Sequence, residues 1–236
     1  MEGVARHFDL VAFDVAGTTI SVADEVPAAL RYAFSTVDLG VSDAQVHAVR
    51  GLSKRQAIEN LLLTLSPSLD SEALATQRDA IFASFKERLI ESYETATVQP
   101  IDGVEVTFSW LRERGVAIAL TTGFDRELLD RLLARVGWTG TLDAVVCDND
   151  VARGRPAPDL IREAMHRTTT KDVARVVAVG DTTADLYAAN HAEVGYAIGV
   201  LSGAHPLEVL RQAPHDVIIE SVADLPEALR TRGADE

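Results

Sequence analysis

The chain has 236 residues, of which 47% are hydrophobic and 25% charged, a composition that supports a folded core and excludes general disorder. Acidic residues outnumber basic ones by 36 to 22, and the formal charge of −14 argues against nucleic acid or an anionic membrane as partner. The single cysteine, Cys147, excludes an internal disulfide bond. No apolar run reaches the roughly 18 residues of a membrane span, and the first ten residues lack a signal-peptide pattern. A cytoplasmic location is therefore expected.

Six short apolar runs, rich in Val and Ile, predict buried parallel strands. They are continuous rather than alternating, as expected for strands that helices cover on both faces. Helical patterns separate several of them, for example at residues 125–136 and 184–192. Strand and helix repeated at this spacing predict an α/β fold built on an open, Rossmann-like parallel sheet. The six runs are residues 8–13, 116–120, 143–147, 175–180, 194–200 and 216–220.

The segment from about residue 22 to residue 98 has no strand-like run and predicts consecutive amphipathic helices. One helix begins near Pro27, which suits a first helical turn. A second is expected to run without a break from about Asp43 to residues 61–63, and a third from residue 71 to about residue 93. This all-α insert predicts two domains: a core of residues 1–20 and 99–236, and a helical domain of residues 21–98.

Polar residues follow the predicted strands at their carboxyl ends, where open α/β sheets bind ligands. A carboxylate can act as a nucleophile, carboxylate oxygens bind Mg²⁺, and hydroxyls with a fixed cation hold phosphoryl oxygens. Each residue taken singly is as well explained as a helix cap or turn residue, but the set suits phosphoryl transfer. The set consists of Asp14, Thr122, Arg155, Asp181 and Asp185.

In their order along the chain, these residues resemble the motifs of the haloacid dehalogenase superfamily, and the helical insert resembles its cap domain. The resemblance implies that Asp14 is a nucleophile that becomes an aspartyl-phosphate. It implies that Thr122 and the Gly123 amide hydrogen-bond the phosphoryl group, and that Arg155 neutralises its charge. Most members carry a lysine at the position of Arg155.

The same resemblance implies Mg²⁺ as cofactor. The implied ligands are Asp14, the Ala16 carbonyl, Asp181 and Asp185, the last as a ligand or as an acid behind the ligands. Most phosphatases of the superfamily carry a second aspartate at the position of Ala16, and that aspartate protonates the leaving alcohol. Because losing a general acid costs roughly 10²–10⁴ in rate, an ordinary alkyl phosphate ester is expected to be a poor substrate.

The run from Asp14 to Thr19, together with Arg155, resembles the phosphonoacetaldehyde hydrolases (phosphonatases) within this superfamily. Those enzymes cleave a C–P bond with a cap-domain lysine that forms a Schiff base with the substrate aldehyde, so that the carbon leaves as an enamine. Lys54, three residues after Gly51, is the corresponding candidate. An amine nucleophile must be partly neutral, and Arg50, expected on the same helical face, could lower the pKa of Lys54.

Three positions depart from the phosphonatase pattern: a histidine is replaced by Ala57, a tyrosine by Phe124 and a methionine by Arg50. The chain is therefore expected to be phosphonatase-like and to act on a 2-oxoalkylphosphonate or another phosphorylated carbonyl compound. Arg50 could pair with an additional anionic group on that substrate. The resemblance also implies a homodimer. The remaining expected substrate contacts are Ala16, Gly17, Thr18, Gly51, Gly123 and Phe124.

Two other functions stay open at this point. A phosphatase acting on phosphate esters or acyl phosphates with good leaving groups would keep Asp14 as nucleophile and use Lys54 only to bind substrate. A catalytically idle phosphate-binding or regulatory module would keep the fold without the chemistry.

Overall fold

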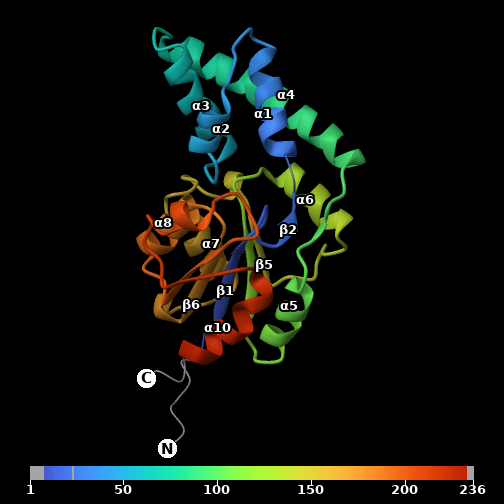
Figure 1. Cartoon of the computed structure of the whole chain (residues 1–236), viewed down its shortest axis with the longest axis vertical. Coiled ribbons are helices and arrows are strands. Elements are labelled where there is room, and N and C mark those ends of the chain that lie inside the picture. The colour runs from blue at the N-terminus through green and yellow to red at the C-terminus, as the bar shows by residue number, and fades with distance from the viewer. Residues whose placement is uncertain (1–7, 23, 233–236) are drawn as a thin grey trace, which may run out of the picture.

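A six-stranded parallel sheet lies between two layers of helices in the computed structural model, which describes residues 8–22 and 24–232 (Figure 1). The strand order is β5-β4-β1-β6-β7-β8, and every neighbouring pair is parallel. Each of the six predicted strands is present, so the predicted Rossmann-like α/β fold is confirmed. The strands are Leu10–Asp14 (β1), Ala117–Thr121 (β4), Ala144–Val146 (β5), Val176–Gly180 (β6), Tyr196–Val200 (β7) and Val217–Ile219 (β8).

Successive residues of β1 point to opposite faces of the sheet, and each face has its own helices. Phe13 packs in one apolar cluster with Phe108 of α5, whereas Leu10 packs in another with Leu160 of α7. The helices predicted at residues 125–136 and 184–192 are present as α6 and α8. The helices of the two layers are Val104–Arg112 (α5), Arg126–Arg135 (α6), Asp159–Arg167 (α7), Thr183–Ala192 (α8), Leu207–Leu210 (α9) and Leu225–Arg232 (α10). Three short 3₁₀ turns are Asp148–Asp150 (η1), Val173–Arg175 (η2) and Val222–Asp224 (η3).

Four helices form a separate group above the sheet in Figure 1, and we call residues 25–95 the helical unit. The long helix α4 contacts both α1 and α3, and its Phe85 is completely buried. Among the described residues, no helix is long and apolar enough to cross a membrane. The outer ends of the predicted domain ranges, residues 1–7 and 233–236, lie outside the described residues. The helices of the unit are Glu25–Ser35 (α1), Asp43–Ala48 (α2), Lys54–Leu65 (α3) and Ser71–Thr95 (α4).

A short antiparallel ribbon joins the chain segments that enter and leave the helical unit. It pairs Ile20–Ser21 (β2) with Gln99–Pro100 (β3). Two-residue strands carry no periodic pattern, and Pro100 lacks the backbone donor of a regular strand, so no local pattern predicted this ribbon.

The prediction of one continuous helix from Asp43 to residues 61–63 is wrong. The chain breaks into α2 and α3 because Gly51 adopts φ of +81°, outside the helical region. Ser53 then starts α3 by accepting a hydrogen bond from the Gln56 amide at 3.3 Å. The break places Arg50 in a loop and makes Lys54 the first residue of α3.

Phe108 provides a test of the contact between α5 and the sheet. It is 2% exposed, and its ring centroid lies 5.4 Å from that of Phe13 and 5.2 Å from that of Trp138. We expect Phe108→Ala to lower the free energy of unfolding by about 3–5 kcal/mol, measured by urea denaturation. Val106→Ala, on the same helix but 71% exposed, should change it by less than about 0.5 kcal/mol. Equal effects of the two substitutions would contradict this packing.

Candidate active site

Three neighbouring strands bring polar residues to one edge of the sheet. Strand β1 lies between β4 and β6, and the chain continues outward from this centre in both directions, which makes the edge a topological switch point. Asp14 ends β1 in register with Thr121 of β4, and Asp181 follows β6 directly. The residues predicted to share a site at this edge line a single cavity: Asp14, Thr122, Arg155, Asp181 and Asp185.

The Arg155 guanidinium holds the Asp14 carboxylate in a buried ion-pair network. Its Nη1 atom pairs with Asp14 Oδ1 and lies 2.6 Å from Asp185 Oδ1. Its Nη2 atom donates hydrogen bonds of 2.8 Å to both the carbonyl and the hydroxyl oxygen of Thr121. A planar guanidinium can make these bonds at once, and a lysine ammonium could not make them in the same geometry. Thr121 was not among the predicted site residues, since no local signal marks a strand threonine as a partner of a distant arginine.

Asp181 is held by the loops that follow β1 and β7. Its carboxylate accepts hydrogen bonds from Thr18 Oγ1 at 3.0 Å and from the Ala204 amide at 2.6 Å. Gly17 adopts φ of +90°, and a Cβ atom there would lie 2.6 Å from Asp181 Oδ2. A Cβ on Gly203 would lie 2.1 Å from the same oxygen. Both glycines therefore allow backbone to approach this carboxylate closely, and the loop at residues 202–204 is a part of the site that the sequence analysis missed.

Asp185 lies in the first turn of α8, where its carboxylate is already engaged on both oxygens. Oδ2 accepts hydrogen bonds from the Thr182 amide at 3.0 Å and from the Thr182 hydroxyl at 2.6 Å, and Oδ1 pairs with Arg155. Asp185 is thus both a helix-capping residue and a member of the buried network.

Three carboxylates share one guanidinium in this buried space. Burial raises the pKa of Asp14 to about 6, an effect that Arg155 opposes and Asp185 reinforces. Burial raises the pKa of Asp181 well above its usual range, and repulsion from Asp14 and Asp185 adds to the rise. This excess of negative charge favours a bound cation.

The donors at this position fit Mg²⁺. Carboxylate oxygens of Asp14 and Asp181 and the backbone carbonyl of Ala16 are the hard ligands that this ion prefers. Within residues 8–22 and 24–232, no three or more His, Cys, Asp or Glu side chains form a group that could hold a metal by themselves. Mg²⁺ typically binds one or two carboxylates and keeps several waters.

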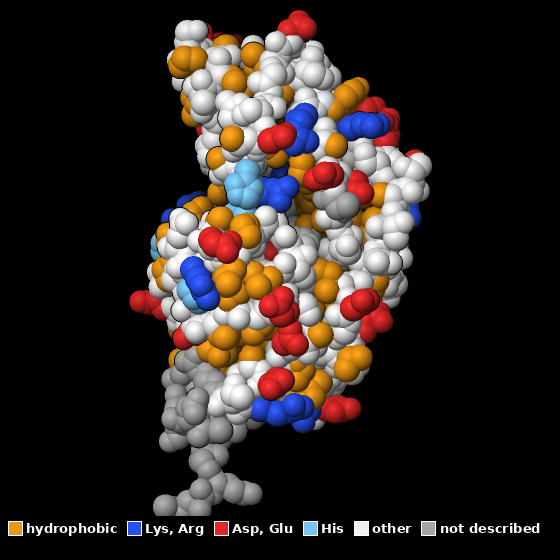
Figure 2. Space-filling model, viewed as in Figure 1, with side chains coloured by type: hydrophobic (Ala, Val, Ile, Leu, Met, Phe, Trp, Pro, Cys, Tyr) orange, Lys and Arg blue, Asp and Glu red, His pale blue; other side chains and the backbone are white. Residues whose placement is uncertain are grey.

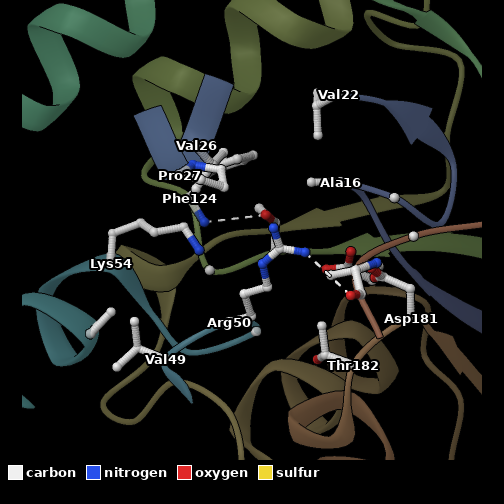
Figure 3. A pocket seen from close by; sticks show the side chains of 18 of the residues that line it. Ala16, Val22, Val26, Pro27, Val49, Arg50, Lys54, Phe124, Asp181 and Thr182 are labelled. Carbon is white, nitrogen blue, oxygen red and sulfur yellow. Dashed lines mark hydrogen bonds between the residues drawn. The ribbon is translucent and has the colours of Figure 1, made fainter. Parts of the chain in front are cut away.

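The loop and helix start around Gly51 bring two cations from the helical unit to the same cavity. Figure 3 shows the side chains of Lys54 and Arg50 reaching into the space that Asp181 borders on the other side. Lys54 Nζ lies 3.2 Å from the Leu52 carbonyl and 5.3 Å from the centre of the Phe124 ring. Arg50 Nη1 donates a hydrogen bond of 3.2 Å to the carbonyl of Ala204, across the junction with the sheet.

Burial lowers the pKa of Lys54, and Arg155 lowers it further, whereas Asp14 raises it. The position of Lys54 at the start of α3 acts in the same direction as burial, because the positive end of the helix dipole disfavours an ammonium group. The amine is therefore neutral more often than that of an exposed lysine. The expectation that Arg50 would act from the same helical face is wrong, because Arg50 lies in the loop before α3; Arg155 is the main cationic contributor.

Asp148 is a further charged residue near Lys54 that the sequence analysis missed. Asp148 is the first residue of η1, two residues after the end of β5. Its carboxylate accepts a hydrogen bond from Ser53 and interacts electrostatically with Lys54. Burial raises the pKa of Asp148. A position at the carboxyl end of a strand identified Asp14 and Asp181 as candidate site residues. The same position could have identified Asp148.

The helical unit is seated closely on the sheet edge. The molecular surface narrows between the helical unit and the part that contains the sheet, and histidine and Arg or Lys side chains lie at this narrowing (Figure 2). His47 of α2 and His205, which follows β7, face each other there with ring centroids 5.0 Å apart. The cavity between the two parts has a volume of about 320 Å³, within the range of small-molecule sites.

An Asp–Arg pair at the switch point of a parallel sheet, beside clustered carboxylates and under a helical unit, defines a class of α/β enzyme. The model of the haloacid dehalogenase-like hydrolases matches residues 11–198, and the chain belongs to this family of hydrolases.

Several relatives are named phosphonoacetaldehyde hydrolase. The one from Lactiplantibacillus plantarum is 28% identical over 252 residues, covering 93% of this chain and 94% of its own. The one from Bacteroides fragilis is 30% identical over 220 residues, covering 89% and 82%. The solved structure of a phosphonoacetaldehyde hydrolase like protein from Oleispira antarctica has a TM-score of 0.83 at 22% identity and covers 98% of this chain and 94% of its own. A hydrolase from Pseudomonas syringae has a TM-score of 0.84 at 19% identity, with coverage of 94% and 98%. The predicted resemblance is confirmed.

Gly51 tests how tightly the helical unit is seated. A Cβ at Gly51 would lie 2.2 Å from Thr182 Oγ1, whereas nothing lies within 4 Å of a Cβ at Gly115, which has a similarly positive φ. We expect Gly51→Ala and Gly115→Ala to cost similar backbone strain, about 1–2 kcal/mol each. Only Gly51→Ala should push the loop away and speed the reaction of Lys54 with an amine-acylating reagent severalfold, measured by mass spectrometry against Lys171. Equal labelling of Lys54 in the two variants would contradict this contact.

Proposed function

We propose that this chain is a Mg²⁺-dependent, phosphonatase-like hydrolase that cleaves the C–P bond of a 2-oxoalkylphosphonate. The observation that carries the proposal is that the Lys54 amine and the Asp14 carboxylate line one cavity, the first from the helical unit and the second from the sheet. The relatives named phosphonoacetaldehyde hydrolase support the same reaction class.

Two covalent steps follow from this arrangement. The neutral Lys54 amine adds to the substrate carbonyl, and with the uptake of one proton from solvent it expels water, which leaves a protonated imine. Asp14 then attacks phosphorus, and the electron pair of the breaking C–P bond moves into the imine to form an enamine. Water hydrolyses the aspartyl-phosphate to release phosphate, and protonation and hydrolysis of the enamine return Lys54 and release the ketone or aldehyde.

The phosphoryl group would be held by residues that the sheet edge supplies. Thr122 is 2% exposed and accepts a hydrogen bond of 3.2 Å from the Phe124 amide, which leaves its hydroxyl proton for a phosphoryl oxygen. The Gly123 amide and the Arg155 guanidinium would stabilise the charge of the transferring group. Asp14, Asp181 and the Ala16 carbonyl would hold Mg²⁺, with Asp185 held behind them by Arg155 and Thr182. When bound, this ion would offset the negative charge of the phosphoryl oxygens.

The methyl side chain of Ala16 favours C–P cleavage over hydrolysis of a simple ester. It lines the cavity beside Asp14 and has no proton to give to a leaving alcohol. An enamine needs no such proton at the moment of bond cleavage, because the imine takes up the electron pair. The helical unit would act as a cap that carries Lys54 to the site and excludes water.

The homodimer, the cytoplasmic location and the domain boundaries at residues 20/21 and 98/99 stay predictions.

Borohydride reduction tests the Schiff base. With phosphonoacetaldehyde and Mg²⁺ present, we expect a reduced adduct at Lys54 and none at Lys86 or Lys171, the other lysines of the chain, located by mass spectrometry. Lys54→Ala should abolish both the adduct and phosphate release from the phosphonate. Asp14→Asn should still give the adduct but release no phosphate. No adduct with the phosphonate, while phosphate is still released from phosphate esters, would instead indicate the phosphatase alternative, in which Lys54 only binds substrate.

The pH dependence of trapping tests the environment of Lys54. Because burial lowers the pKa of Lys54, a larger fraction of its amine is neutral at a given pH than in free lysine. The yield of adduct should therefore rise with pH and level off below the pKa of a free lysine side chain, roughly 10.4. N-acetyl-lysine, trapped with the same substrate, provides the reference curve. A midpoint at or above the reference would mean that the Lys54 amine stays charged in the cavity.

A further inference from the structure

The cavity extends beyond the phosphoryl site into the helical unit. At this end the lining side chains are apolar and come from the segments that begin and cross the unit. We call this part the apolar recess, and it is lined by Val22, Val26, Pro27, Leu30, Val46 and Phe85. Ser21 and Asp24, which also border the cavity, are exposed and mark its outer edge.

The recess is the wall that the packed side chains of the helical unit present to the cavity. Leu30 and Val46 are each 4% exposed and Phe85 is fully buried, so they belong to the core of the helical unit. Protein interiors are normally close-packed, and an open apolar space costs stability unless something occupies it. Ala57 also lines the cavity, and with its small methyl side chain it is 2% exposed.

The recess and the metal-binding edge border different parts of the cavity. In Figure 3, Val26 and Pro27 lie beside Phe124, above the space that Lys54 enters, and Asp181 lies across that space. A substrate that places phosphorus at Asp14 and its carbonyl carbon at Lys54 must direct the remaining substituent of that carbon away from the carboxylates. The recess is the apolar part of the cavity and is therefore the part that suits such a substituent.

We propose that the recess binds a hydrocarbon group on the carbonyl carbon, so that the preferred substrate is a 2-oxoalkylphosphonate with a chain of several carbons, a ketone rather than an aldehyde. This rests on the proposed function. The reaction consumes one water, and its products are phosphate and a methyl ketone that keeps the chain. A charged group at the end of the chain would lose its hydration in the recess without gaining a partner there.

Linear alkylphosphonates from methyl to hexyl test binding in the recess separately from catalysis, because they have no carbonyl group and cannot form an imine. Measured by calorimetry with Mg²⁺ and the full chain, affinity should increase up to about fourfold per methylene, the equivalent of about 0.8 kcal/mol, until the recess is filled. An affinity that does not change with chain length would overturn the proposal. So would tighter binding of a chain that ends in a carboxylate, which would instead support a second anionic group at Arg50.

Two substitutions assign the effect to the recess. Val26→Phe and Val22→Phe, both at half-buried positions, should fill the recess and reduce the ratio of hexyl- to methylphosphonate affinity toward one. Val106→Phe, at a position 71% exposed on α5, should leave the ratio unchanged. An unchanged ratio in both recess variants, once their thermal unfolding shows that they fold, would overturn the assignment.

Hydrolysis assays separate this inference from the proposed function. The expected result is a higher kcat/KM for a 2-oxoheptylphosphonate than for phosphonoacetaldehyde. If affinity rises with chain length but no 2-oxoalkylphosphonate is cleaved, the recess is supported and the proposed reaction fails. If phosphonoacetaldehyde is cleaved while alkylphosphonate affinity stays flat, the reaction stands and the recess inference fails.

Discussion

The buried pairing of Arg155 with Asp14 and Asp185 is the constraint on which the rest of the site depends. Removing one partner of such a network leaves an uncompensated buried charge, which typically costs about 3–5 kcal/mol. The guanidinium therefore does more than assist a reaction: it allows carboxylates to collect at the switch point of the sheet. The same bonds fix the direction of the Asp14 carboxylate, since Arg155 is itself held by the carbonyl and hydroxyl of Thr121.

The two parts of the molecule contribute different chemistry. The sheet edge provides what every phosphoryl transfer needs, namely a nucleophile, hydrogen-bond donors and ligands for a cation. The helical unit provides Lys54 and the apolar recess, which in our proposal decide which bond breaks and which substituent the substrate carries. Ala16 connects the two contributions, because a site without a proton donor beside its nucleophile depends on an electron sink supplied from elsewhere.

Much of this could be predicted from the sequence, and the reasons are local. Continuous apolar runs identified the six strands, and the rule that ligands bind at strand ends then identified Asp14, Thr122 and Asp181. The break at Gly51 was missed because a single glycine inside a helical pattern is often tolerated, and its close approach to Thr182, a residue distant in sequence, leaves no local signal. Thr121 and the loop at residues 202–204 contribute through contacts between distant segments, which no local pattern reveals.

The choice of arginine at position 155 has a consequence for any kinetic study of this centre. The guanidinium is desolvated, but Asp185 and Asp14 outweigh that effect and raise the pKa of Arg155 above its already high ordinary value. The counter-charge of the nucleophile therefore does not titrate at any pH at which proteins are normally assayed. A bell-shaped rate profile recorded for this protein would have to be assigned to other groups, with Lys54 the first candidate for its acidic limb, because the Lys54 amine must lose its proton before it can react.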